Sequence, residues 1–141
     1  MGERDRIELQ AEVDAPRERV WQLVATPAGL AEWLDEAELE ARPTGAFRFR
    51  LLDGVASGQV IALDPPQHIS LRWAWQDEAA PQSVVAFDAI DHGERTHLTL
   101  RHVGLRDLRQ LELHEALWSH WFPRLCRAAG ERTDAATNVP G

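Results

Sequence analysis

Six short segments of this chain alternate apolar and polar residues, and one long segment near its end carries apolar residues at helical spacing. A period of two predicts strands with one buried face, and it occurs in residues 7–13, 47–51, 55–63, 69–75, 84–90 and 96–102. An antiparallel sheet with one polar face must cover its other face, and only the segment 108–129 is long enough to do so. The sequence therefore predicts an α+β fold, in which a curved antiparallel sheet of about six to seven strands wraps around a long C-terminal helix.

Two helix-start signals follow the first predicted strand. Asp14-Ala15-Pro16 and Thr26-Pro27 each place a proline where its missing N–H would have been unpaired anyway. Two short helices are therefore expected between the first strand and the rest of the sheet.

Two of the predicted strands have faces that the sequence assigns. In the segment 84–90, Asp88 occupies one side, so the inward set is expected to be Val85, Phe87 and Ala89. In the last strand, His102 shares the inward face of the apolar residues, whereas His97 points to the opposite face.

The C-terminal helix is expected to turn one stripe toward the sheet. The stripe consists of Leu113, Ala116, Leu117, His120, Trp121 and Leu125. Pro123 lies inside this pattern and predicts a kink near Ser119, because proline removes a backbone hydrogen bond. Gly130 is expected to end the helix, and residues 131–141, which lack periodicity, are expected to form a disordered tail.

Length and charge limit the domain count and the partners. The 141 residues fit a single domain, which we place at residues 1–130. A formal net charge of -8 argues against nucleic acid and anionic membranes as partners. The single cysteine, Cys126, suits a reducing compartment, and the N-terminus has no apolar stretch typical of a signal peptide. We therefore expect a cytoplasmic protein.

Motifs for several kinds of chemistry are missing from the sequence. There is no Gly-x-Ser-x-Gly elbow of a hydrolase and no glycine-rich loop that would hold a phosphate. No His, Cys, Asp or Glu residues have the spacing of a zinc site. No metal, cofactor or catalytic residue is therefore predicted.

Several motifs resemble the helix-grip superfamily called SRPBCC, which includes START domains and polyketide cyclases. The chain is most similar to its branch named for the activator of the heat-shock-protein-90 ATPase. The matching motifs are Asp14-Ala15-Pro16 with Val20-Trp21, Thr26-Pro27 with Leu30 and Trp33, Thr44-Gly45-Ala46-Phe47-Arg48-Phe49, Asp64-Pro65-Pro66 with Ile69 and Trp73, Thr96-His97-Leu98-Thr99-Leu100-Arg101-His102, and His114 with Trp118. Leu117 replaces the glycine that the branch carries before this tryptophan, which would narrow a pocket at that turn.

Six tryptophans suggest an aromatic cavity between the sheet and the last helix. The candidate lining residues are Trp33, Phe47, Phe49, Trp73, Trp75, Phe87, Leu98, Leu100, His102, Leu117, His120 and Trp121. His102 and His120 would supply the polar contacts to a small hydrophobic ligand. The alternative interpretation is that the aromatic residues simply fill a solid core.

Two other functions stay open at this point. The resemblance also implies a polyketide cyclase or dehydratase, in which a histidine would move protons, but no carboxylate partner is evident on the same face. It further implies a protein-interaction domain whose partner would be a chaperone, and such a domain would present an exposed apolar patch.

Overall fold

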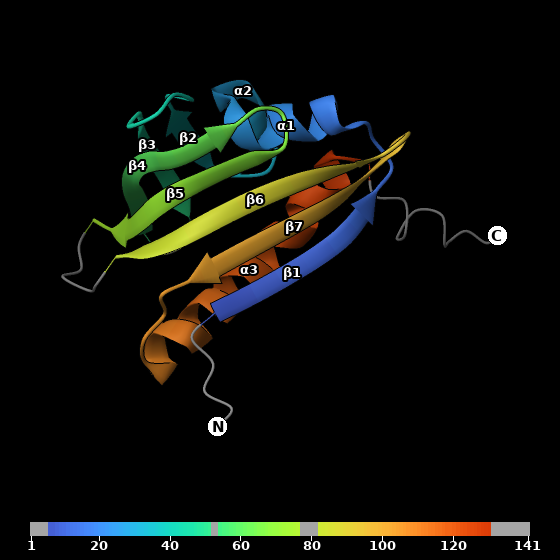
Figure 1. Ribbon diagram of the computed structural model, residues 1–141. Helices are drawn as coiled ribbons and strands as arrows, with labels where there is room; N and C mark the ends of the chain where they lie inside the picture. The colour runs from blue at the N-terminus through green and yellow to red at the C-terminus, as the bar shows by residue number, and fades with distance from the viewer. Residues whose placement is uncertain (1–5, 52–53, 77–81, 131–141) are drawn as a thin grey trace.

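The computed structural model describes residues 6–51, 54–76 and 82–130. Within these ranges the elements are β1 (Arg6–Val13), α1 (Arg17–Ala25), α2 (Pro27–Leu30), β2 (Glu36–Leu39), β3 (Ala46–Leu51), β4 (Gly54–Asp64), β5 (His68–Trp75), β6 (Ser83–His92), β7 (Arg95–Val103) and α3 (Leu108–Ala128). The described strands form one seven-stranded sheet, and α3 lies behind β6, β7 and β1 on one face of it (Figure 1). The predicted α+β helix-grip fold, with two short helices after the first strand, is confirmed.

The sheet is antiparallel throughout, in the order β1-β7-β6-β5-β4-β3-β2. Strands β2 to β7 follow one another as a meander, and β1 joins the far edge by pairing with β7. Alternation along each strand then decides which side chains face α3. The predicted inward set of β6, Val85, Phe87 and Ala89, is confirmed by its burial.

The two short helices begin where the prolines predict. The hydroxyl of Thr26 accepts a hydrogen bond from the backbone N–H of Gly29 at 3.0 Å, which caps α2. Gly29 packs directly on α1, since a Cβ at that position would overlap the carbonyl oxygen of Gln22. The two helices therefore pack against each other and against the sheet, where α1 contacts β6 and β7 and α2 contacts β2.

The predicted stripe of α3 is partly wrong. The residues that α3 buries are Leu111, His114, Trp118, Trp121, Phe122, Leu125 and Cys126, at a spacing of three or four. Leu113, Ala116 and His120 are exposed. His120 is wrong because it follows Trp118 by two residues, which is about 200° around the helix, so it lies on the side opposite to the buried one.

Both ends of α3 carry recognisable signals. The side chain of Asp107 accepts a hydrogen bond from the backbone N–H of Gln110 at 2.8 Å. After the helix, Gly130 has a φ of 96°, so it ends the helix as predicted. The helix continues through Pro123, and the kink near Ser119 stays a prediction.

The predicted tail cannot be compared with the structure, because it falls outside the described residues. The predicted tail at 131–141 lies beyond residue 130.

None of the helices in the described part of the chain combines the length and the apolar character that crossing a membrane requires.

Gly58 of β4 provides a test of how tightly the sheet is built. It pairs with Trp73 of β5, and a Cβ there would overlap the carbonyl oxygen of Arg72 and lie 3.1 Å from the ring of Phe47. We expect Gly58→Ala to lower the free energy of unfolding in urea by about 3 kcal/mol, because the backbone oxygen cannot move away freely.

Gly54→Ala is the matched control in the same strand. A Cβ there would lie 3.4 Å from the ring of Trp75, which is an ordinary contact. This variant should change the free energy of unfolding by less than about 1 kcal/mol. Equal stability of the two variants would contradict the packing described for β4 and β5.

Candidate functional site

The space between the sheet and α3 is filled with aromatic side chains around Trp73. The ring centroid of Trp73 lies 5.6 Å from that of Trp118 and 6.0 Å from that of Phe47. The rings of Phe49 and Trp75 are 6.2 and 5.8 Å away. These separations are typical of packed aromatic pairs, so this part of the interior is close-packed.

The candidate lining residues are placed as follows. Those that are buried in the core are Trp33, Phe47, Phe49, Trp73, Phe87, Leu98, Leu100, His102 and Trp121. Trp75 and Leu117 are half-buried, and His120 is exposed on the outer side of α3. The structure therefore brings most of the aromatic candidates together around Trp73, whereas the ring of Trp121 contacts the exposed His120 at 4.7 Å.

Trp33 shows how an outlying member of this group is held. It follows α2, and its indole N–H donates to the carbonyl of Leu23 in α1 at 2.8 Å. Its ring meets Phe87 edge-on at 6.2 Å. Trp33 thus joins the short helices to the sheet, which is a structural role.

The helix and the sheet exchange hydrogen bonds between indoles and imidazoles. Trp118 of α3 donates from Nε1 to Nδ1 of His102 on β7 at 3.0 Å. In the other direction, Trp75 of β5 donates from Nε1 to Nε2 of His114 on α3, also at 3.0 Å. The two histidine rings meet edge-on with centroids 4.5 Å apart. The exchange therefore connects three elements through one polar cluster inside the core.

These contacts assign the tautomer of each ring. Nδ1 of His102 accepts from an indole, so Nε2 carries the hydrogen and donates to the hydroxyl of Ser83 at 2.7 Å. Nε2 of His114 likewise accepts, so Nδ1 carries the hydrogen and donates to the carbonyl of Gln110 at 2.8 Å. Burial lowers the pKa of His102 well below its ordinary value, with a further contribution from the neighbouring His114. His102 is therefore held neutral.

A small cavity lies beside this cluster, between the end of β5 and the start of α3. Its volume is about 30 Å³, which is room for about one water molecule. It is lined by Trp73, Ala74, Trp75, Ser83, Gly104, Leu105, Arg106, Asp107, Gln110 and His114. The indole N–H of Trp73 is buried and has no hydrogen-bond partner among the described residues. The wall of the cavity therefore includes Trp73, whose indole N–H has no hydrogen-bond acceptor among the described residues.

A much larger hollow lies on the opposite, solvent side of the sheet, and we call it the outer trough. Its volume is about 760 Å³. The lining residues are Pro27, Ala37, Glu38, Leu39, Glu40, Ala46, Phe47, Arg48, Ser57, Gly58, Gln59, Arg72, Gln76 and Gln82. Most of them are polar side chains of the outward face, so this trough does not match the hydrophobic cavity that the sequence predicts.

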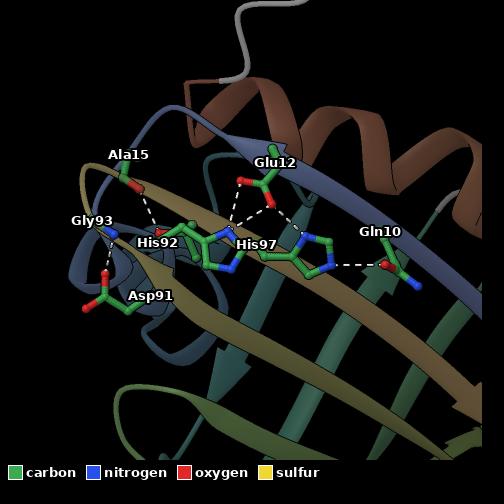
Figure 2. A network of polar contacts seen from close by, with 8 residues as sticks. Gln10, Glu12, Ala15, Asp91, His92, Gly93 and His97 are labelled. Atoms are coloured by element: carbon green, nitrogen blue, oxygen red, sulfur yellow. Dashed lines mark hydrogen bonds and ion pairs between the residues drawn. The ribbon is translucent and has the colours of Figure 1, made fainter.

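A second group of histidines lies on the surface at the tip of the β6–β7 hairpin (Figure 2). Glu12 of β1 accepts from Nδ1 of His97 at 2.8 Å and from Nδ1 of His92 at 3.1 Å. The hydrogen bond from His97 is the main cause that lowers the pKa of the Glu12 carboxyl. These contacts tie the edge strand to the hairpin. No group of three potential metal ligands occurs among the described residues.

Sequence reasoning missed His114, Trp118 and Ser83 as members of the interior cluster. His114 and Trp118 are four residues apart, so they share a helix face with Leu111 and Leu125. That second stripe was visible in the spacing. Ser83 lies two residues before Val85, which pairs with His102, and the local sequence does not specify this pairing of β6 with β7.

A comparison with protein families shows to which family the chain belongs. The sequence model described as "Activator of Hsp90 ATPase homolog 1-like protein" matches residues 14–130. The chain belongs to this family. No curated protein sequence matches the chain.

Solved structures share the fold of this family member. A protein from Mesorhizobium loti is 25% identical with a TM-score of 0.76, and the match covers 87% of this chain and 95% of that one. DynU16, from the dynemicin biosynthetic locus, is 23% identical with a TM-score of 0.77; the match covers 89% of this chain but only 47% of DynU16. Aha1 from Colwellia psychrerythraea, solved as a dimer, is 18% identical with a TM-score of 0.73, over 88% of this chain and 95% of that one.

The neutral state of His102 predicts how stability depends on pH. Protonation favours the unfolded chain, because the pKa of His102 is lower in the folded state. Its contribution is complete above the unfolded pKa of about 6.5 and is lost as the pH falls below it. Between pH 6.5 and 5.5, the free energy of unfolding should fall more steeply in the wild type than in His102→Gln, by up to about 1.4 kcal/mol per pH unit.

Glutamine suits this comparison because its amide can accept from Trp118 and donate to Ser83 without titrating. Urea unfolding at a series of pH values measures both curves. If the free energies of unfolding of the two proteins ran parallel with pH, the pKa of His102 would not be lower in the folded state.

Proposed function

We propose that this domain binds a small hydrophobic molecule that carries one hydrogen-bond acceptor. The site is an enlarged form of the small cavity between β5 and the start of α3. Its apolar walls are the rings of Trp73 and Trp75 and the side chain of Leu105. The ligand's acceptor would take the hydrogen bond that Trp73 offers.

The unpartnered N–H of Trp73 is the observation that carries this proposal. A buried donor without a partner costs about 1–3 kcal/mol, and nearly all buried polar groups avoid that cost. The neighbouring indoles of Trp75 and Trp118 both have imidazole acceptors. Trp73 lies between them, lines the cavity, and offers a donor that a bound molecule or a water can satisfy.

Entry of a ligand requires the cavity to grow, since its present volume suits a water molecule. The cavity is bordered by residues 104–107, a connection that is neither strand nor helix. Displacement of this connection would open the cavity without breaking the strands. Leu105 is the buried side chain of this connection, so it would have to move to let a ligand enter the cavity.

A matched pair of probes tests the proposal. We expect 2-acetylnaphthalene, which has a carbonyl acceptor, to bind about tenfold more tightly than 2-ethylnaphthalene, which has none, because one hydrogen bond contributes about 1.4 kcal/mol. Binding is measured by tryptophan fluorescence and by the indole N–H signal of Trp73 in ¹H–¹⁵N spectra. Trp73→Phe should bring the two affinities together.

Trp121→Phe is the control for that variant. The indole N–H of Trp121 is also buried without a described partner, but Trp121 does not line the cavity. This variant should keep the preference for the acetyl probe. Equal binding of both probes to the wild type, or no binding of either, would contradict the proposal.

Leu105→Ala tests the route of entry. Shortening this side chain enlarges the cavity, so the variant should bind 2-acetylnaphthalene more tightly than the wild type while losing about 2–3 kcal/mol of stability. Isothermal titration and urea unfolding measure the two effects. Weaker binding by a folded Leu105→Ala protein would place entry elsewhere.

The binding proposal is favoured over the two alternatives. A cyclase needs an acid and a base that face the cavity, whereas the ring nitrogens of His114, which lines it, are engaged by Trp75 and by the carbonyl of Gln110. A chaperone partner would need an exposed apolar patch, and the large exposed apolar residues described lie on three separate elements: Ile61, Ile90, Leu108 and Leu113.

A further inference from the structure

Three side chains on the outward face of the sheet form a continuous chain of hydrogen bonds. Nδ1 of His68 on β5 lies 2.7 Å from Oδ1 of Asp88 on β6. Nε2 of the same ring lies 2.6 Å from the hydroxyl oxygen of Ser70, two residues further along β5. A carboxylate only accepts, so Nδ1 carries the hydrogen, and Nε2 accepts from the hydroxyl of Ser70. The order is hydroxyl, imidazole, carboxylate.

The carboxylate at the end of this chain is held in place. Asp88 pairs directly with His68 in the register of β5 and β6. Its second oxygen, Oδ2, is buried without a hydrogen-bond partner among the described residues and lies 3.9 Å from Nη1 of Arg101. The hydrogen bond to Asp88 holds the imidazole in one tautomer, in which Nε2 can take the proton of the Ser70 hydroxyl.

The hydroxyl of Ser70 has small neighbours. In the register of the sheet, Ser70 lies opposite Ala62 of β4 and Ala86 of β6. Ala62 is exposed and Ala86 is half-buried, so neither methyl group extends far over the serine. Ser70 itself keeps 8% of its surface exposed, which leaves a narrow approach from the solvent side.

A positively charged side chain lies near the serine. Arg72 is on the same face of β5, two residues on, which is about 7 Å along a strand. Its side chain has no hydrogen bond or ion pair to any described residue, whereas Arg50 on β3 pairs with Glu36. Arg72 also lines the outer trough. A substrate that extends from the trough past Arg72 to Ser70 would bring its developing oxyanion near the guanidinium.

We propose that Ser70 is a nucleophile for small esters, with His68 as its base and Asp88 as the positioning residue. The oxygen of Ser70 would attack the ester carbonyl carbon while its proton passes to Nε2 of His68. The alcohol then leaves with that proton, and water, activated by His68, releases the acid and restores the hydroxyl. The site lies on the face of the sheet opposite Trp73, so this proposal does not depend on ligand binding in the small cavity.

A fluorophosphonate probe tests the nucleophile directly. The oxygen of Ser70 would bond to phosphorus, fluoride would leave, and the proton would pass to His68. We expect one adduct on the native protein, located on Ser70 by peptide mass spectrometry and absent from Ser70→Ala. His68→Gln and Asp88→Asn should each slow the labelling at least about tenfold, because the base is lost or misplaced.

Ser57→Ala is the matched control, since Ser57 lines the outer trough beside Arg72 and makes no hydrogen bond to a histidine of the described residues. It should be labelled at the rate of the wild type. A ¹H–¹⁵N spectrum of each variant confirms that it is folded. Absence of an adduct on the folded native protein, an adduct on another residue, or unchanged labelling in folded His68→Gln would each overturn the proposal.

Discussion

The exchange of hydrogen bonds between α3 and the sheet is the interaction on which the rest of the interior depends. A helix that covers a sheet is usually held by apolar contact, which specifies its position only loosely. Here Trp118 and His102, and in the reverse direction Trp75 and His114, must meet in register for each buried group to be satisfied. A shift of α3 along the sheet would break both hydrogen bonds, at a cost of about 1–3 kcal/mol for each unsatisfied group.

This arrangement explains why the interior differs from an open pocket. The aromatic rings that could line a cavity are instead packed around Trp73, and the room left beside them is about 30 Å³. The same packing leaves the N–H of Trp73 as the donor that the cluster does not use. On the other face, pairing of His68 with Asp88 builds a second polar chain that ends at Ser70. The two faces of β5 thus carry two separate candidate sites.

The strands were predictable because half-buried strands must alternate, and the inward face of β6 followed from Asp88 alone. The buried stripe of α3 was not predictable, because Leu113, Ala116 and His120 also fall at helical spacing. The stripe that the structure buries contains His114, a residue type that the sequence alone does not place in a core. The buried His114 accepts a hydrogen bond from Trp75, and that contact joins residues 39 apart in sequence. The chain from Ser70 to Asp88 likewise depends on strand register, which no local pattern specifies.

Long-range ¹H–¹⁵N correlation of the histidine rings at neutral pH tests the central exchange most directly, since it reports which nitrogen of each ring carries the hydrogen. The account predicts opposite tautomers for the two touching rings: Nε2–H for His102 and Nδ1–H for His114. The same tautomer in both rings, or a doubly protonated His102, would contradict the way in which α3 is fixed to the sheet.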